Sequence, residues 1–235
     1  MRLAILSDVH GNGFALRAVL DDIHAANPDA LYNLGDTVWG AADPATAWAL
    51  QAEFAPPTVR GNTDERMAGM RAGKEEMRGW VTSQLPENIG AHLGQLPTFV
   101  DVAGGEVRLA HGSPRDPWEA LMLSGEEERP ATPDEMRERL GEFSGAVCVV
   151  GHTHSEIFRR IDGLSLVNVG AVSQRHREGP PLARWLLLTR QNGHWNIEFR
   201  RTPYDVQAAA AWARANAPTD IGEDEAAWLL AGQEP

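Results

Sequence analysis

The sequence predicts an α/β fold built as a sandwich with mixed sheets, and two observations lead to this class. Short apolar runs alternate with helical patterns over the first third of the chain, the order expected of parallel strands joined by right-handed crossovers. Later apolar runs are separated by tight turns at Asp162-Gly163 and Asn192-Gly193, which favours antiparallel pairing. The 235 residues contain no repeat, long Ser/Gly linker or composition break, so we expect a single domain over 1–235.

Five elements are expected in the first third of the chain. Apolar side chains between residues 16 and 23 have the spacing of an amphipathic helix. Asp43-Pro44 offers an N-cap and a first-turn proline to a second helix, whose buried side is expected to carry Ala47, Leu50 and Phe54. In order, these elements are a strand at 2–6, the helix ending at Asn27-Pro28, a strand at 30–34, the helix beginning at Asp43-Pro44, and a short strand at 58–60.

The rest of the chain changes character. Residues 63–96 are polar and helical, and residues 99–102 and 106–110 flank a glycine turn that is typical of a hairpin. Thr132-Pro133-Asp134-Glu135 is a capping box that begins a helix. The remaining elements expected are an apolar strand at 146–150, an antiparallel meander over 156–201, and Ala/Trp-rich helices near 205–216 and 221–231.

Charge and cysteine content exclude several classes of protein. Lys and Arg number 21 against 33 Asp and Glu, a net charge of −12 that argues against a broad nucleic-acid-binding surface. The single cysteine, Cys148, excludes an internal disulfide framework and a Cys-rich zinc module, and fits a reducing cytoplasm. The apolar run Leu3-Ala4-Ile5-Leu6 is too short for a signal peptide or a membrane span. We therefore expect a cytoplasmic protein with no membrane partner.

Polar clusters follow five of the expected strands. In α/β sheets the carboxyl ends of strands are where ligands bind. Because alternate side chains of an extended segment point the same way, Asp8 and His10 are expected to reach one point together, as are His152 and His154. The clusters, in chain order, are Asp8-Val9-His10, Gly35-Asp36, Gly61-Asn62-Thr63-Asp64, His111-Gly112 and Gly151-His152-Thr153-His154.

The residue types in these clusters indicate a metal centre. Two Asp, one Asn and four His offer oxygen and imidazole ligands without a thiolate, a set that suits Mn²⁺, Fe²⁺, Zn²⁺, Co²⁺ or Ni²⁺. Seven ligands are too many for one tetrahedral ion and adequate for two ions that share a bridging carboxylate. Paired ions of this kind are what a phosphoester hydrolase needs.

The five clusters, in this order, resemble the calcineurin-like metallophosphoesterase superfamily over roughly residues 1–190. The resemblance implies a four-layer α-β-β-α sandwich of two mixed sheets flanked by helices, with helical cap-like segments at about 63–96 and 114–135. The segments 40–44, 111–116 and 168–172 are similar to the small bacterial and archaeal branch of the family, which contains phosphodiesterases and relatives of diadenosine tetraphosphatases.

The resemblance also implies roles for individual residues, with Mn²⁺ as the favoured ion and Fe²⁺, Zn²⁺, Co²⁺ and Ni²⁺ as alternatives. Metal one would be held by Asp8, His10, Asp36 and His154. Metal two would be held by Asp36, Asn62, His111 and His152, with Asp36 and a hydroxide bridging the ions. The implied catalytic residues are Asp36, Asn62, Asp64 and His111, and the candidates for substrate contacts are Asn12, Asn62, Arg115 and Arg175.

One position departs from the family pattern. Many relatives carry His between the Asn and the Asp of the third cluster, where it can protonate the leaving oxygen, and this chain has Thr63. A hydroxyl is too weak an acid for that transfer near neutral pH, so leaving groups that need no proton, such as nucleoside phosphates or aryl alcohols, are favoured. His92 or His176 is an alternative acid.

These observations predict a two-metal phosphohydrolase that cleaves phosphodiester or pyrophosphate bonds of small soluble substrates, nucleotides above all, by in-line attack of the bridging hydroxide. One alternative is a phosphomonoesterase or protein phosphatase. The other is a non-catalytic interaction module on the same fold. The apolar C-terminal helices could also mediate contact between copies in a homo-oligomer.

Overall fold

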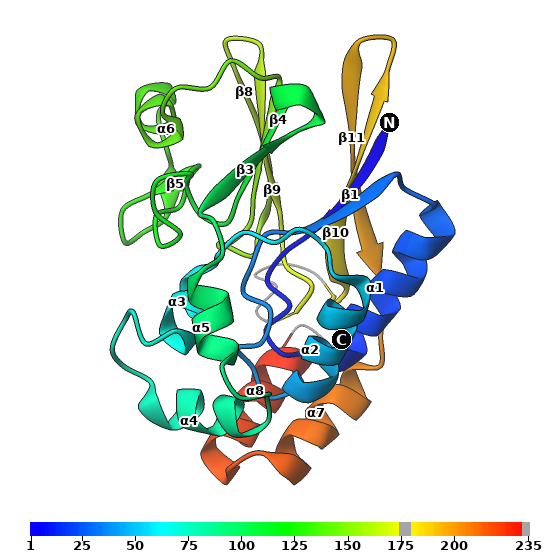
Figure 1. Ribbon diagram of the computed structural model, residues 1–235, viewed down its shortest axis with the longest axis vertical. Coiled ribbons are helices and arrows are strands. Elements are labelled where there is room, and N and C mark those ends of the chain that lie inside the picture. Colours follow the sequence, from blue (N-terminus) through cyan, green and yellow to red (C-terminus); the bar gives the residue numbers. More distant parts are fainter. Residues whose placement is uncertain (174–179, 232–235) are drawn as a thin grey trace.

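The computed structural model describes residues 1–173 and 180–231 and contains two mixed β-sheets, which fill the upper half of the view in Figure 1. The first sheet has the strand order β11-β10-β1-β2, and the second has the order β3-β4-β7-β9-β8. The strands of the first sheet are β1 (Arg2–Leu6), β2 (Ala30–Asn33), β10 (Ala183–Gln191) and β11 (His194–Thr202). Those of the second are β3 (Phe99–Val102), β4 (Val107–Ala110), β7 (Val147–Val150), β8 (Glu156–Ile161) and β9 (Leu164–Val169).

Parallel pairs lie inside both sheets. β1 is parallel to β2, with Leu3 opposite Ala30, and antiparallel to β10 on its other side. β4, β7 and β9 are parallel to one another, while β3 and β8 pair antiparallel at the two edges. A further two-stranded ribbon joins β5 (Leu123–Ser124) to β6 (Arg129–Pro130). The mixed pairing predicted from the sequence is therefore confirmed.

Three apolar clusters separate the layers. Between the sheets, Ile5 and Leu186 of the first sheet pack against Leu109 and Val149 of the second. Outside the first sheet, α1 (Gly13–Ala26) packs Leu16, Val19 and their neighbours against β1 and β10. Outside the second, α6 (Pro133–Leu140) lies over β4, β7 and β9. Two mixed sheets flanked by helices, the fold class predicted from the sequence, are thus what the chain forms.

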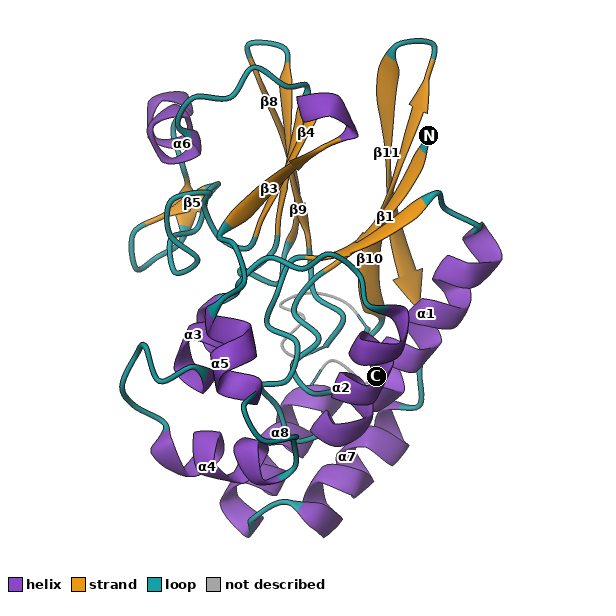
Figure 2. Cartoon of the chain, in the orientation of Figure 1, coloured by secondary structure: helices purple, strands orange, loops and turns teal. Residues whose placement is uncertain are grey.

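The other helices gather beyond the carboxyl ends of the strands. In Figure 2 the strands occupy the upper part of the view, α2, α4, α7 and α8 lie below, and the loops that follow the strands gather between them. These helices are α2 (Pro44–Phe54), α3 (Asn62–Met67), α4 (Glu75–Ser83), α5 (Ile89–Gly94), α7 (Val206–Asn216) and α8 (Thr219–Leu230), and η1 (Ala103–Gly105) is a short 3₁₀ turn.

Three expectations about the elements were wrong. Phe54 is 46% exposed, because the buried side of α2 turns toward Gln51, whose amide pairs with Asn33 and Thr58. Residues 58–60 form one parallel bridge, Thr58 to Asn33, and no strand, since the two prolines before Thr58 have no N–H to extend a ladder. The expected meander over 156–201 is two hairpins in different sheets, β8–β9 in the second and β10–β11 in the first.

One of the two expected helical segments is present, and nothing tests whether either segment acts as a cap. The expectation of helix over 114–135 was wrong, because this segment consists of turns and the ribbon of β5 and β6, and α6 begins only at Pro133. Residues 63–96 contain most of α3 and all of α4 and α5. α7 and α8 turn apolar faces toward each other, with Val206, Ala209 and Leu229 in one buried cluster, so the homo-oligomer contact stays a prediction. Within residues 1–173 and 180–231, none of the helices has the length and apolarity needed to cross a membrane.

The partly buried carboxylate of Asp22, on α1, makes the free energy of unfolding depend on pH. Asp22 accepts hydrogen bonds from Thr202 Oγ1 at 2.7 Å and Trp185 Nε1 at 3.1 Å, and Arg200 Nη2 lies 3.1 Å from its other oxygen. Burial raises the pKa of Asp22, but these bonds and the charge of Arg200 outweigh it and lower the pKa below the ordinary value. A depressed folded-state pKa adds stability above the unfolded pKa that is lost as pH falls through the folded pKa.

We therefore expect Asp22→Asn to lower the free energy of unfolding by about 1 kcal/mol at pH 7. The difference in the free energy of unfolding between wild type and variant should become smaller as pH falls below 4, where the wild-type carboxylate also becomes neutral. Urea unfolding of metal-free protein at both pH values measures this. Asp21→Asn, at the exposed neighbouring position, is the matched control. A deficit that stays constant with pH would mean that the charge of Asp22 does not contribute.

Candidate metal centre

The seven side chains that the sequence predicts as metal ligands lie on the loops between the sheets and the helical half of the molecule. Except for Asn62, which follows the isolated bridge at Thr58, each ligand lies on a loop that follows a strand, so β1, β2, β4 and β7 deliver their ends to one edge. Asp8 and His10 lie between β1 and α1, Asp36 after β2, Asn62 at the first residue of α3, His111 directly after β4, and His152 and His154 after β7.

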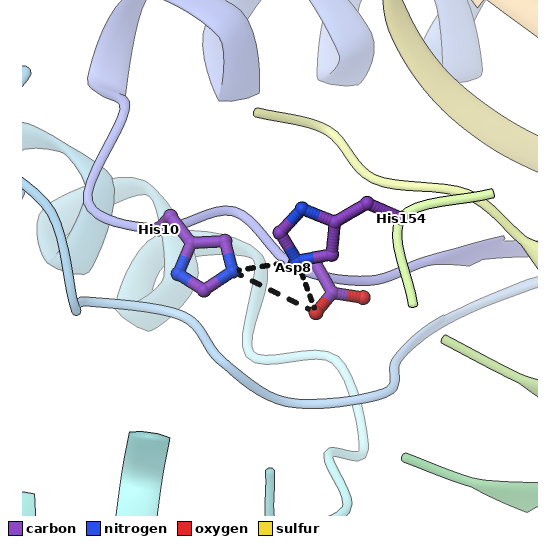
Figure 3. Close-up of side chains that lie close together, drawn as sticks. All are labelled: Asp8, His10 and His154. Atoms are coloured by element: carbon purple, nitrogen blue, oxygen red, sulfur yellow. Dashed lines mark hydrogen bonds and ion pairs between the residues drawn. The ribbon is translucent and has the colours of Figure 1, made fainter. Parts of the chain in front are cut away.

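One group of candidate ligands consists of Asp8, His10 and His154 (Figure 3). The Nε2 atoms of His10 and His154 lie 3.1 Å apart. Asp8 Oδ1 is 3.3 Å from His154 Nε2 and 3.7 Å from His10 Nε2. His154 lies 144 positions after His10, and yet the three residues present one carboxylate and two imidazoles to a single point.

A second group shares Asp8 with the first. Asp36 Oδ2 lies 3.5 Å from His111 Nε2, and Asp8 Oδ1 lies 3.9 Å from the same nitrogen. Asp36 Oδ2 is also 3.8 Å from His10 Nε2, so this carboxylate oxygen lies between the two groups. The two groups are thus neighbours joined by carboxylates.

Asn62 extends the second group. Its Oδ1 lies 2.9 Å from His111 Nε2 and 3.0 Å from His152 Nδ1. The arrangement brings all seven predicted ligands into contact with at least one other member of the set.

The donor set fits divalent cations. Asp8, Asp36 and His111 are almost fully buried, and buried carboxylates are costly unless a positive charge accompanies them. In the described part of the chain Asp8 Oδ1 accepts no hydrogen bond, although three imidazole nitrogens lie within 4.0 Å. An orphaned carboxylate oxygen facing imidazoles has the chemistry of a metal ligand, and oxygen and nitrogen donors suit borderline divalent ions.

The charges of the two carboxylates dominate the electrostatics of the centre. Burial lowers the pKa of His10, but its pairing with Asp8 and the charges of Asp36 and Asp8 outweigh burial and raise the pKa to about 9. Burial raises the pKa of Asp8, yet attraction to His111 and His154 holds it well below its ordinary value. His152 lies at the other extreme, since burial and repulsion by His111 lower its pKa to about 4. The centre therefore attracts positive charge most strongly around Asp8 and Asp36.

The backbone reaches this arrangement by a route that the sequence did not suggest. The predicted extended geometry of 8–10 and 152–154 was wrong, because Asp8, His10, Asp36, His152 and His154 all have φ between 48° and 70°. A left-handed conformation costs about 1–2 kcal/mol in each non-glycine residue and persists where the surroundings enforce it. Here backbone bonds enforce it, from Asp8 N to Gly35 O and from His10 N to Asp36 O.

Further contacts orient the candidate ligands. His10 Nδ1 donates to the Trp39 carbonyl at 3.0 Å, and His111 Nδ1 donates to the Leu34 carbonyl at 2.9 Å, so the Nε2 atom of each ring is left for an ion. No pattern in the sequence predicted these carbonyl partners. Asn168, in a segment noted only for the family resemblance, bonds Gly151 O and Thr153 Oγ1 below the histidine loop.

Asp64 lies behind the centre rather than in either group. Its Oδ2 accepts the backbone N–H of Gly61 at 2.8 Å and of Asp36 at 3.0 Å, and burial with the charge of Asp36 raises its pKa to about 6. A side chain at Gly61 would place Cβ 2.0 Å from Asp36 Oδ1, which explains the glycine. Asp64 thus positions the Asp36 loop, and direct participation in catalysis stays a prediction.

The structure gives little support to the predicted substrate contacts, because Asn12 and Arg115 both bond other protein groups. Asn12 is buried, with Oδ1 capping α1 at Ala15 N and Nδ2 donating to Ser173 Oγ. Arg115 forms two bonds to Glu119 and one to Glu138, so a phosphate would have to displace both carboxylates. Both contacts stay predictions.

The alternative general acids differ in position. His92, on α5, packs edge-on against Trp48 at 5.5 Å between ring centres, and no described contact joins it to the predicted ligands. Arg175 and His176 lie outside the described residues. Thr63 is 7% exposed and its Oγ1 is buried without a hydrogen-bond partner in the described chain.

Comparisons with known proteins identify the family and the fold of this chain. The sequence model of the calcineurin-like phosphoesterase superfamily domain matches residues 1–192. A metallophosphoesterase structure from Sphaerobacter thermophilus is 28% identical, with a TM-score of 0.78 over 99% of this chain and 100% of that one. A hypothetical protein of Pyrococcus horikoshii shares the fold at 16% identity, with a TM-score of 0.76 over 97% of both chains. An uncharacterized protein of Methanocaldococcus jannaschii is 26% identical over 88% of this chain and 89% of its own length.

Proposed function

Because this chain belongs to the calcineurin-like phosphoesterase superfamily, we propose that it is a two-metal phosphohydrolase that cleaves phosphodiester or pyrophosphate bonds of small soluble substrates, with nucleotides as the favoured class. The observation that carries the proposal is the pair of ligand groups around Asp8 and Asp36. The two groups share Asp8, and within each group the ligand atoms lie within 4.8 Å of one another. A cytoplasmic location belongs to the proposal and is supported by Cys148, which is free and buried.

The residues divide naturally between two ions. Asp8, His10, Asp36 and His154 would hold one ion, and Asp36, Asn62, His111 and His152 would hold the other. The position of Asp36 Oδ2 between His10 and His111 supports its role as the shared ligand. Bound divalent ions would supply a nucleophile from water at neutral pH and neutralise charge on the phosphoryl oxygens. Mn²⁺ is the favoured ion, and Fe²⁺, Zn²⁺, Co²⁺ and Ni²⁺ are alternatives with the same ligand preferences.

The chain's own groups orient the substrate and the ligands. Asn62 Oδ1 faces His111 and His152, which leaves its Nδ2 to donate to a phosphoryl oxygen. Asp64 fixes the Asp36 backbone, and the backbone N–H of Thr63 donates to Asp36 Oδ1 at 2.8 Å. These contacts keep the Asp36 carboxylate in one orientation without a change of conformation during the reaction.

The side chain of Thr63 supports the preference for diesters and anhydrides. It occupies the position after Asn62 and offers a hydroxyl, which does not release a proton near neutral pH. Leaving groups that depart as stable anions, such as nucleoside phosphates, need no proton there. Alkyl alcohols do need one and should therefore react slowly.

Substrate ranking with Mn²⁺ tests the proposal. Purified protein should hydrolyse bis-p-nitrophenyl phosphate faster than an alkyl phosphomonoester. The opposite ranking would replace the proposal with a phosphomonoesterase or protein phosphatase. An absence of turnover with all five divalent ions would leave the non-catalytic interaction module.

A further inference from the structure

Two arginine side chains lie over one tryptophan ring beside the candidate metal centre. The guanidinium carbon of Arg66 lies 4.8 Å from the centre of the Trp118 ring, and that of Arg71 lies 5.4 Å from it. We call Arg66, Arg71 and Trp118 the arginine–tryptophan cluster. None of its members was among the substrate contacts predicted from the sequence.

Both segments that form the cluster begin at a candidate metal ligand. Arg66 is four residues after Asn62 on α3, so the two side chains share one face of the helix. Trp118 belongs to the loop that leaves His111 and folds back on itself. A Cβ at Gly112 would lie 2.7 Å from the Pro117 carbonyl oxygen. The cluster therefore lies at the edge of the centre formed by Asn62 and His111.

Among the residues that the structure describes, Arg66 forms no ion pair with a carboxylate. Glu65 accepts the Trp118 Nε1–H at 2.8 Å and lies 3.3 Å from Arg60 Nε and 3.6 Å from Arg71 Nε. Arg66 donates to the carbonyl oxygens of residues 72 and 73, and no described carboxylate lies within 4.0 Å of it. The chain has a net charge of −12, and yet the guanidinium of Arg66 has no ion-pair partner in residues 1–173 and 180–231.

The contrast with Arg115 strengthens this point. Arg115 is also close in sequence to a candidate ligand, but Glu119 and Glu138 neutralise it. Stacking on an indole holds a guanidinium plane in place and leaves its N–H edge able to grip phosphate oxygens in pairs. Arg66 meets both conditions for anion recognition, an available charge and restraint, whereas Arg115 is held by the carboxylates that neutralise its charge.

We propose that Arg66, held by Trp118 and assisted by Arg71, binds a second phosphate group of the substrate, next to the one that is cleaved. The inference rests on the proposed function and narrows it, because such a substrate carries a chain of phosphoanhydrides, as nucleoside polyphosphates do. A lone diester has no group for this site.

Inhibition by inorganic anions tests the inference. Tripolyphosphate and orthophosphate are compared as inhibitors of bis-p-nitrophenyl phosphate hydrolysis, with Mn²⁺ in excess over the polyphosphate. In Arg66→Ala the inhibition constant of tripolyphosphate should rise about tenfold or more, the loss expected for a hydrogen bond to a charged group, and that of orthophosphate should rise far less. Arg214→Ala, which removes an exposed arginine paired with Glu223, is the control and should change neither constant.

Three outcomes would overturn the inference: no rise for tripolyphosphate, an equal rise for both anions, or the same rise in the control. If Arg66→Ala does not fold, Arg66→Gln is measured instead. Glutamine keeps part of the aliphatic side chain and an N–H donor for the carbonyl oxygens of residues 72 and 73. Wild-type protein that turns over no ester with any of the ions would defeat the proposed function alone. Titration calorimetry of tripolyphosphate with the wild type and the variant then decides the role of Arg66 separately.

Discussion

Replacing Asp36 with Asn is expected to lower kcat by about a thousandfold, the scale of losing one charge-stabilising group from an active site. Asp36 Oδ2 lies between His10 and His111, where it would touch both ions. Asn has the same shape, and its side-chain oxygen can still accept the Thr63 N–H, so the change removes charge and little else. Turnover of bis-p-nitrophenyl phosphate at saturating Mn²⁺ measures the effect, and the unfolding midpoint checks that the fold is retained.

The matched control is Asp134→Asn on α6. Asp134 is an exposed carboxylate paired with Arg137, on the far side of the second sheet from the first, and its removal should leave kcat unchanged. A variant at Asp36 that keeps more than about a tenth of the wild-type kcat would show that this carboxylate is not shared by the ions.

Thr63→His is expected to raise the turnover of alkyl phosphomonoesters about a hundredfold relative to that of bis-p-nitrophenyl phosphate. The imidazole titrates near neutral pH and can protonate an alkoxide as it leaves, whereas the threonine hydroxyl cannot. The aryl leaving group departs without a proton and should gain little. The measurement is the ratio of the two kcat values, wild type against variant.

A size-matched variant separates acid catalysis from a change in packing. Thr63 is almost fully buried, so any larger side chain disturbs its surroundings. Thr63→Gln adds bulk and hydrogen-bonding groups without an acid, and should not change the ratio. An equal gain for both esters in Thr63→His, or the same ratio in Thr63→Gln, would refute the leaving-group argument.

Local signals in the sequence predicted most of the elements. The capping box at Thr132 and Glu135 is present, with Glu135 N donating to Thr132 Oγ1 and Thr132 N donating to Glu135 Oε2. Such signals depend on residues only three or four positions apart, and so the sequence alone is enough to predict the helix that they begin. The assignment of β8–β9 and β10–β11 to different sheets depends on packing between distant segments, and no local pattern encodes it.

Some features of the candidate metal centre could likewise be predicted from the sequence, and others could not. The ligand types and their positions after strands were visible in the sequence, because metal chemistry restricts residue type and parallel strands share an edge. The left-handed backbone at Asp8 and His152 was not, since tertiary hydrogen bonds impose it. Likewise, Arg115 is paired with Glu138, which lies 23 residues away in the sequence. No local pattern around Arg115 could predict that this partner would compete with a phosphate for its guanidinium.

The central claim is that two divalent ions share Asp36, and anomalous scattering from crystals of the Mn²⁺-loaded protein tests it most directly. We expect two manganese peaks for each chain, one bordered by Asp8, His10 and His154 and the other by Asn62, His111 and His152, with Asp36 touching both. A single peak after full loading, or peaks away from these side chains, would contradict the account.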